Sequence, residues 1–307
     1  GMRMYDSVMK FPDQLTMGAV NDAGIIYNVG KAMGEQCKRA GIQVDYAPVV
    51  DINNNPDNPV IGFRSFGEDK YKVALFGTKI MQGLQDVGVM ATAKHFPGHG
   101  DVSVDSHYDM PVINKTREQL DSLELYPFRQ LFEAGVGSVM IAHLSIPAID
   151  TIAHQPTSLS QKNVTGLLRD KLGFKGISFT DALEMQGVAK YYPGSGGSVQ
   201  SLIAGNDMLC LPADIPGTIA GVLAAIKKGK LDKDDMEARV KKVLLVKYHL
   251  GLHNILAVNI DNLTKDLNAE VPSLRAEAAE HSLTLLQLTH PRLLPLNKAS
   301  SIAYVGV

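Results

Sequence analysis

The stretch KHFPGHGDVSVDSHYDMP, residues 94–111, holds three histidines, three aspartates and two glycines. Side chains of these types bind metal ions, shape anion-binding loops or transfer protons. The two glycines, Gly98 and Gly100, suit a phosphate-binding loop and equally a loop geometry that other residues reach only at a cost. Neither G-x-G-x-x-G nor G-x-x-x-x-G-K-[ST] occurs in the stretch, so a nucleotide site is not indicated.

Metal binding is the next candidate, because the stretch contains five side chains of ligand type: His95, His99, Asp101, Asp105 and His107. A helical H-x-x-x-H pair needs both rings on one face of a continuous helix. The Pro-Gly pair between His95 and His99 disfavours that helix, and no second cluster with ligand spacing occurs elsewhere. We therefore expect no metal ion and no other cofactor.

Acid/base chemistry fits the pair Asp105 and His107. A carboxylate that accepts one ring N–H fixes the tautomer of an imidazole and leaves the other nitrogen to exchange a proton near neutral pH. Such a pair can protonate a leaving group. The alternative is a solvated loop histidine beside a turn-forming aspartate.

A proton donor needs a partner that attacks or stabilises the reacting carbon, and Asp181 in FTDALEM is the candidate. It follows the apolar run GISFT and so emerges from an expected buried strand. The alternative is an N-cap of a following helix, because Glu184 stands three residues later, as in a capping box.

Three basic residues could donate charge-assisted hydrogen bonds to substrate oxygens: Arg64, Lys94 and His95. A surface ion pair is the competing role for Arg64. A buried, unpaired ammonium is costly, so Lys94 at a strand end needs a partner, and Asp51 at the end of VDYAPVVD is the expected one.

The elements that must position these residues are short apolar runs separated by longer amphipathic stretches. The apolar runs predict buried parallel strands at 44–50, 89–95, 138–144, 176–180 and 207–211. The stretches before, between and after them predict helices at 18–40, 68–86, 116–134, 158–171, 215–229 and 232–250, several ending at a glycine. This alternation predicts either a (β/α)₈ barrel or an open doubly wound sheet.

Polar residues at the ends of the expected strands favour the barrel. Five of them stand at or just after C-terminal strand ends: Asp51, Lys94, His95, His143 and Asp181. Those ends converge on one mouth in a barrel and spread along an edge in an open sheet. We therefore predict an α/β fold of the (β/α)₈ TIM-type barrel class over residues 1–252.

The rest of the chain predicts a change of domain. Residues 253–272 lack periodicity and predict a linker, residues 273–287 predict a helix, and residues 300–307 predict a buried strand. A parallel strand needs a crossover after it. We therefore expect residues 273–307 to be the incomplete beginning of a second α/β domain.

The composition excludes partners that are selected by charge. Thirty basic and 32 acidic residues give a net charge of −2, so the protein has no overall electrostatic attraction to nucleic acid or to an anionic membrane. No apolar run reaches the roughly 20 residues that span a bilayer, and the first residues lack the apolar core of a signal peptide. Cys37 and Cys210 stand in apolar contexts typical of buried free thiols.

Together these segments resemble the catalytic domain of glycoside hydrolase family 3, in particular its β-N-acetylglucosaminidase branch. The segment KHFPGHGDVSVDSH is similar at every defined position to the K-H-F-P-G-H-G-x₄-D-S-H signature of that branch. Further agreement lies in DYAPVVDIN, GFRSFGED, IAHLSIPAID and FTDALEM, where threonine replaces serine before the aspartate. LLPLNKASSIAYVGV resembles the entry into the family's C-terminal α/β sandwich. The resemblance covers nearly the whole chain.

The resemblance implies a role for each candidate residue. Asp181 would be the nucleophile, and His107 the general acid/base, oriented by Asp105. Four residues would hold sugar hydroxyls: Arg64, Lys94, His95 and Arg3. Because GMR at residues 1–3 resembles the tail of the family's D-x-E-x-G-x-x-x-R stretch, we expect the first barrel strands to be missing from this chain.

The implied activity is retaining hydrolysis that releases terminal β-linked N-acetylglucosamine from a carbohydrate substrate. Within the family, an exo-β-glucosidase or xylosidase is the alternative. Transfer to phosphate stays open, because a neutral imidazole repels an anionic acceptor less than a carboxylate does. A sugar-binding module without catalysis is the alternative outside enzymes. The sequence leaves the oligomeric state open.

Overall fold

A parallel sheet of five strands organises the chain in the computed structural model, which describes residues 7–105 and 109–288. The strands are β1 Val44–Asp45, β2 Met90–Phe96, β3 Ser138–Ile141, β4 Ile177–Ala182 and β5 Met208–Cys210. All five predicted strands are therefore present. No helix in the two described ranges combines the length and apolar character needed to span a membrane.

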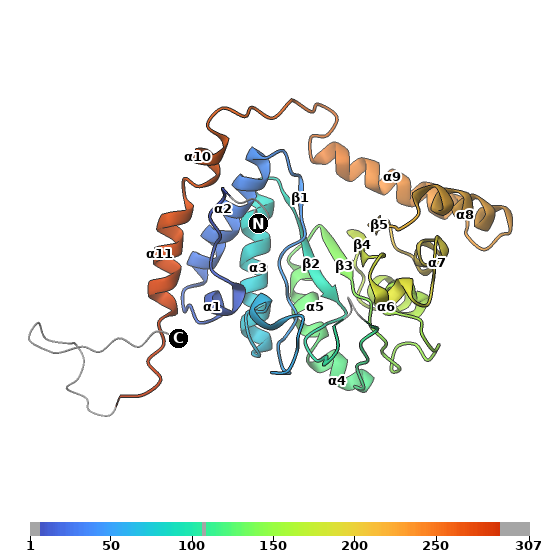
Figure 1. The fold of residues 1–307 in the computed structure, drawn as a ribbon, viewed down its shortest axis with the longest axis horizontal. Helices are drawn as coiled ribbons and strands as arrows, with labels where there is room; N and C mark the ends of the chain where they lie inside the picture. The colour runs from blue at the N-terminus through green and yellow to red at the C-terminus, as the bar shows by residue number, and fades with distance from the viewer. Residues whose placement is uncertain (1–6, 106–108, 289–307) are drawn as a thin grey trace, which may run out of the picture.

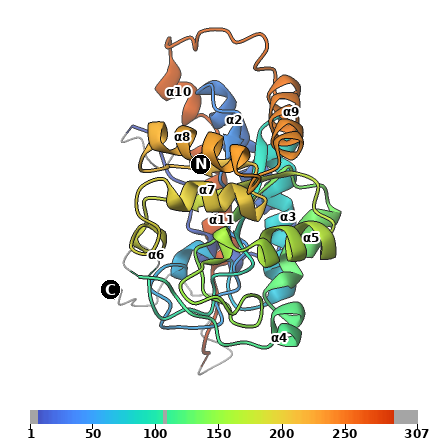
Figure 2. The same cartoon turned by 90° about the vertical axis from the view of Figure 1, so that its right-hand side faces the viewer.

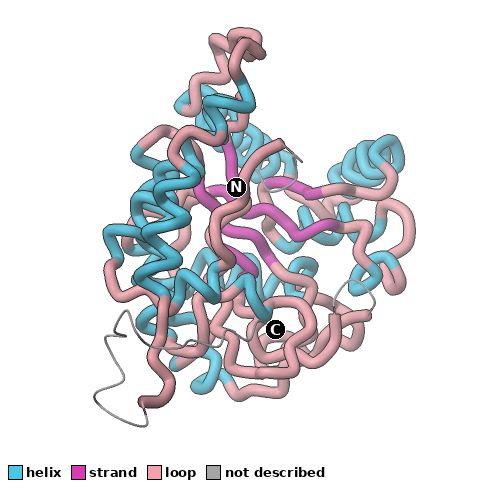
Figure 3. The backbone as a smooth tube through the Cα atoms, turned by 60° about the vertical axis from the view of Figure 1, so that its left-hand side comes forward, coloured by secondary structure: helices cyan, strands magenta, loops and turns pink. Residues whose placement is uncertain are grey.

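The strand order identifies a barrel-type sheet. It runs β1-β2-β3-β4-β5, the order of the chain, and each neighbouring pair is parallel. A doubly wound sheet reverses its order at a switch point. The sheet also curls, since the ring of Tyr46 beside β1 meets that of Phe179 on β4 at 5.2 Å between centroids, across two intervening strands. The predicted barrel class is confirmed as an incomplete, curled sheet (Figure 3).

Helices cover the outer side of this sheet and its β5 end (Figures 1 and 2). In chain order the helical elements are α1 Gln14–Gly18, α2 Ala23–Arg39, the 3₁₀ turn η1 Gly62–Arg64, α3 Lys70–Asp86, α4 Arg117–Ser122, α5 Leu125–Glu133, the 3₁₀ turn η2 Thr157–Leu159 and the π-helix η3 Lys162–Lys171. They continue with α6 Gln186–Ala189, α7 Gly196–Ala204, α8 Ile215–Lys227, α9 Lys233–His249, α10 Leu263–Leu267 and α11 Val271–Ser282.

Local capping explains where the structure begins or ends the predicted helices. The helix expected over 18–40 begins later, as α2 at Ala23, because the Asp22 carboxylate accepts a hydrogen bond from Gly24 N and caps the helix there. Thr116 and Gln119 form a capping box at the start of α4. Glycines at 41, 88, 135 and 251 have φ between 75° and 85°, which confirms the left-handed glycine ends.

Two apolar layers fix the sheet. The larger one lies between the sheet and its outer helices and includes the fully buried rings of Phe76, Phe96 and Phe128. The smaller one lies on the inner face, where Phe179 and its neighbours pack against Val246 and other residues of α9. The inner face is therefore filled by apolar side chains near the amino ends of the strands.

The two cysteines are free thiols. Cys37 is buried on α2, as predicted, and burial followed by the nearby charge of Asp45 raises the pKa of its thiol to about 12. The expectation of a buried Cys210 is wrong, because this residue is only partly covered at the end of β5. Its position on the last strand of the described sheet explains the exposure, since no further strand packs beside it.

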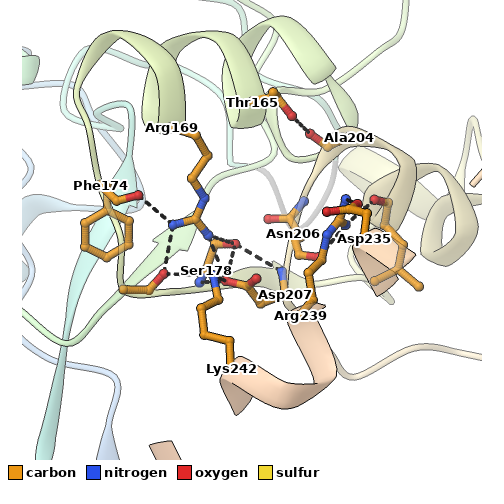
Figure 4. Close-up of polar contacts among 12 residues, drawn as sticks. Thr165, Arg169, Phe174, Ser178, Ala204, Asn206, Asp207, Asp235, Arg239 and Lys242 are labelled. Carbon is orange, nitrogen blue, oxygen red and sulfur yellow. Dashed lines mark hydrogen bonds and ion pairs between the residues drawn. The ribbon is translucent and has the colours of Figure 1, made fainter. Parts of the chain in front are cut away.

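A buried ionic network ties η3, β4, β5 and α9 together at the amino ends of the strands (Figure 4). The Asp207 carboxylate accepts from Arg169 and from Lys242, each at 2.7 Å, and from the backbone N–H of Ser178 at 2.8 Å. Arg169 also donates to the carbonyl of Gly176 at 2.8 Å. In barrels this face contributes stability while chemistry takes place at the other face.

Replacing Asp207 with alanine should lower the free energy of unfolding by about 3–5 kcal/mol, because it leaves two cations without their shared partner in a largely buried network. Urea denaturation followed by circular dichroism measures the loss. Glu237→Ala is the control: it breaks an exposed pair with Lys233 and should cost no more than about 0.5 kcal/mol. Equal midpoints for the two variants would contradict this role of Asp207.

The chain after α9 folds back along the first helices. Gln36 of α2 donates to the carbonyl of Leu267 at 2.7 Å, and Arg39 donates to Asp266 at 2.8 Å. Val271 of α11 is also buried. Residues 253–272, expected as a linker, thus include the short helix α10 where packing on α2 stabilises it.

The domain division itself stays a prediction. A helix predicted over 273–287 is present as α11, Val271–Ser282, and it lies against α2 and α1. The strand predicted at 300–307 lies outside the described residues. A second domain from residue 273 onward therefore remains an expectation of the sequence.

Candidate functional site

The predicted polar residues meet at the carboxyl ends of the strands. Lys94 and His95 are near the end of β2, and Asp181 is near the end of β4. Val49, two residues before Asp51, bridges Lys94 in parallel. These positions form one mouth, as the barrel prediction requires.

Asp181 lies near the end of β4, beyond Ile177 and Phe179 of the inner apolar layer. The register of β4 against β5 shifts between Phe179 and Ala182, and His95, His143 and Lys94 lie close enough to act on the Asp181 carboxylate. The N-cap alternative for Asp181 is wrong, because the residue lies inside β4 and the next helix begins only at Gln186, after Met185.

Backbone contacts on both sides hold Asp181 in place. Thr180 Oγ1 accepts from Cys210 N at 2.9 Å, which ties β4 to β5 just before the aspartate. His143 Nε2 donates to the carbonyl of Ala182 at 3.0 Å, and His143 Nδ1 lies 2.7 Å from Ser158 Oγ. The role of Ser158 has no sequence signal, because the contact joins residues fifteen positions apart through a loop.

The surroundings keep Asp181 ionised. Burial alone raises the pKa of its carboxyl, but the nearby His95 and His143, the hydrogen bond from Ala182 N and the Lys94 charge outweigh burial and lower that pKa below its ordinary value. Its Oδ1 accepts from Ala182 N at 2.8 Å. A carboxylate in this state is a nucleophile rather than an acid.

Lys94 lies near Asp181, but it does not form the expected ion pair with Asp51. Burial, followed by the charge of Arg64, lowers the pKa of the Lys94 ammonium, and Asp181, Asp45 and Asp51 offset part of that effect. The expectation that Asp51 pairs directly with Lys94 is wrong, because the Asp51 carboxylate bonds to His95 instead. The strand is irregular at this point, because the register of β2 against β3 shifts between Ala93 and Phe96.

Arg64 and His95 form one unit. Arg64 Nη2 lies 3.1 Å from His95 Nε2, and Arg64 Nη1 donates to the carbonyl of Val60 at 3.3 Å. His95 Nδ1 lies 2.7 Å from Asp51 Oδ2. The alternative of a surface ion pair for Arg64 is wrong, because the guanidinium is partly buried against an imidazole.

The glycines of the opening stretch are explained by space and backbone geometry. Gly98 has φ of 130°, in the region that favours glycine. A Cβ on Gly100 would stand 1.7 Å from the carbonyl oxygen of Ile52, so no side chain fits there. Asn58 Nδ2 donates to the carbonyls of His99 and Gly100, each at 2.9 Å. The first half of the loop is therefore a packed support for the site.

The second half of the loop carries the expected acid/base pair. Asp105 is partly buried, whereas His107 lies outside the described residues, as does Arg3. The flanks of the segment are anchored: Asp101 pairs with Lys115 at 2.9 Å, and Asp109 pairs with Lys190 at 3.0 Å. The second anchor joins the loop to the chain that follows Asp181. Sequence inspection did not single out this pair, because its members stand 81 positions apart.

Among residues 7–105 and 109–288, no group of three or more histidine, cysteine, aspartate or glutamate side chains is arranged to hold a metal ion. Asp51 and His95, which are both of ligand type, bind each other at 2.7 Å.

A curled parallel β/α sheet with an ionised aspartate and a set of basic side chains at its carboxyl mouth defines a TIM-barrel type of site. Comparison with known proteins gives the family. The N-terminal domain of glycosyl hydrolase family 3 matches residues 1–246, so this chain belongs to glycoside hydrolase family 3.

Named relatives are consistent with this assignment. Beta-hexosaminidase A of Pseudoalteromonas piscicida is 30% identical over 322 aligned positions, covering 98% of this chain and 53% of that protein. A beta-hexosaminidase of Chromobacterium violaceum is 36% identical over 234 positions, covering 73% of this chain and 63% of that protein. The structure of a family 3 β-N-acetylglucosaminidase from Paenibacillus sp. str. FPU-7 superposes with a TM-score of 0.83 at 36% identity, covering 91% of this chain and 54% of that one. The chain thus spans between about half and just under two thirds of these relatives' length.

Proposed function

We propose that the protein is a retaining glycosidase that releases terminal β-linked N-acetylglucosamine from cell-wall fragments or other glycans. The observation that carries the proposal is the Asp181 carboxylate, which is ionised, part-buried and placed at the mouth of the barrel. Among the described residues, its one hydrogen bond comes from Ala182 N to Oδ1, so Oδ2 is available to a substrate carbon. The names of the relatives support the sugar specificity.

The chemistry proceeds in two steps. Asp181 attacks the anomeric carbon and forms a covalent glycosyl-enzyme, while the His107 imidazolium gives its proton to the departing glycosidic oxygen. His107, now neutral, then takes a proton from water, and the resulting hydroxide displaces Asp181 from the sugar. Two inversions at the same carbon retain its configuration. Asp105 orients His107 in this proposal, as the family resemblance implies.

Basic residues hold the sugar while it reacts. The Lys94 ammonium near the end of β2 and the Arg64 guanidinium on η1 donate to sugar hydroxyls in a part-buried site where charge-assisted hydrogen bonds are strong. His95 and Arg3 are proposed as sugar-binding residues from the resemblance alone. Retention cannot be inferred here from a distance between two carboxylates, because the acid is an imidazole.

A panel of aryl glycosides tests the proposal. The purified protein should hydrolyse the β-N-acetylglucosaminide faster than the β-glucoside and the β-xyloside, with the β-anomer of N-acetylglucosamine as the first product seen by NMR. Faster turnover of the glucoside or xyloside would shift the assignment to those activities, and formation of a sugar 1-phosphate in phosphate buffer would identify a phosphorylase. Binding of N-acetylglucosamine without turnover of any substrate would contradict the enzymatic proposal.

A further inference from the structure

Asp51 lies behind the substrate-facing residues and has no exposed surface. Its Oδ1 accepts from His99 N at 2.7 Å and from His95 N at 3.1 Å, and its Oδ2 lies 2.7 Å from His95 Nδ1. A buried carboxylate is costly unless it is hydrogen-bonded, and these contacts satisfy both of its oxygens. Every one of the contacts involves the segment that carries the sugar-binding residues.

The contacts determine which nitrogen of His95 carries the proton. A guanidinium can only donate, so Arg64 Nη2, at 3.1 Å, requires a lone pair on His95 Nε2. The proton of the neutral ring is therefore on Nδ1, and it is donated to Asp51 Oδ2. Burial, followed by the charges of Arg64 and Lys94, lowers the pKa of His95 well below its ordinary value, which agrees with a neutral ring.

We infer that Asp51 is a positioning residue that acts on the substrate through His95 and Arg64, an inference that rests on the proposed function. Asp51 fixes the His95 tautomer, the tautomer presents a lone pair to Arg64, and the bond to that lone pair aims the guanidinium at the sugar. The hydrogen bond from His99 N to Asp51 Oδ1 also fixes the position of the loop that begins after β2. One buried acid thus orients a cation that contacts the substrate.

Asparagine is the informative replacement because it keeps the size of the side chain. Its amide has one acceptor oxygen and an NH₂ group with two donors, and around position 51 both sides present N–H groups. The NH₂ group of the asparagine would therefore face an N–H donor. This repulsion is relieved when the His95 proton moves from Nδ1 to Nε2, because Nδ1 can then accept from the amide. An Nε2–H repels Arg64, which then loses its orientation.

The tautomer is measured directly on ¹⁵N-histidine-labelled protein, since a protonated and an unprotonated ring nitrogen differ clearly in ¹⁵N chemical shift. The His95 signals are assigned by their loss in His95→Gln. In the native protein, Nδ1 should be protonated and Nε2 bare at neutral pH. In Asp51→Asn, the population with protonated Nε2 should become the larger one. A protonated Nε2 in the native protein would overturn the inference, even if the variant did not fold.

Kinetics provide the second readout. Asp51→Asn should raise KM for the aryl β-N-acetylglucosaminide by about 10- to 100-fold, the effect of losing one charge-assisted hydrogen bond to the substrate, with a smaller change in kcat. Asp207→Asn is the matched control, because this acid is equally buried in a cationic network on the opposite face of the barrel. It should lower the unfolding midpoint and leave KM within about twofold of the native value.

The outcomes separate a positioning role from a structural one. Equal KM changes in Asp51→Asn and Asp207→Asn, or an unchanged His95 tautomer in Asp51→Asn, would overturn the role of Asp51. The NMR measurement does not depend on turnover. A protein with the stated tautomer that hydrolyses none of the aryl glycosides would therefore contradict the proposed function and leave the Asp51–His95–Arg64 geometry intact.

Discussion

Replacement of Asp181 by alanine is expected to lower kcat/KM for an aryl β-N-acetylglucosaminide by roughly 10⁴-fold or more, the scale on which removal of a covalent nucleophile acts. The structure gives the reason. The carboxylate is held ionised at the mouth of the barrel, with its backbone fixed on one side by Thr180 and on the other by His143. Asp181 is the one acidic residue of β4.

Azide separates loss of the nucleophile from a general defect. In Asp181→Ala the small anion can occupy the space of the missing carboxylate and attack the anomeric carbon from the same side. The product should be the α-glycosyl azide, and turnover should recover in part. Glu184→Ala is the control, because Glu184 is exposed three residues further along and should keep native kcat/KM. Native rates in Asp181→Ala would remove Asp181 from the mechanism.

The ends of the strands are the part of the site that the sequence predicts well. Lys94 and Asp181 each follow a run of apolar residues long enough to define a buried strand, and the parallel βα alternation then brings both to one mouth. That inference needs only local pattern and a topological rule. It succeeds because the interior of a barrel leaves polar groups few places other than the strand ends.

The side-chain contacts within the site could not be predicted from local sequence pattern. Asp51 was expected beside Lys94, yet it binds His95, at the point where the register of β2 against β3 shifts between Ala93 and Phe96. Whether Asp51 pairs with Lys94 or with His95 depends on the local strand register, which the sequence pattern does not show. The same holds for the pair of Asp109 and Lys190, whose contact crosses 81 positions.

The helices show a similar division. Glycine ends at 41 and 135 were predictable, since a left-handed residue has a strong chemical preference. Helix α10 was not, because five residues without periodicity form a helix only where α2 offers a packing surface for Leu267. Tertiary packing contributes most of the stability of so short a helix.

Replacement of His107 by glutamine is expected to distinguish substrates by their leaving groups. A poor leaving group, such as the hydroxyl of a second sugar, needs a proton as the glycosidic bond breaks, so kcat/KM should fall by about 10²- to 10⁴-fold. An activated aryl group leaves without a proton. For that substrate, kcat/KM, which covers the steps up to the glycosyl-enzyme, should change by less than about tenfold.

The base role of the same residue predicts a further difference. Attack of water on the glycosyl-enzyme needs a base whatever the leaving group was, so kcat for the activated substrate should fall in His107→Gln while its kcat/KM is nearly kept. A burst of aryl alcohol should then precede the slower steady state. His154→Gln is the control, because this exposed histidine stacks on Tyr191, 4.4 Å away, outside the proposed machinery. Equal losses in kcat/KM for both leaving groups would show that His107 does not act as the acid, and the proton would then have to come from another group at the mouth.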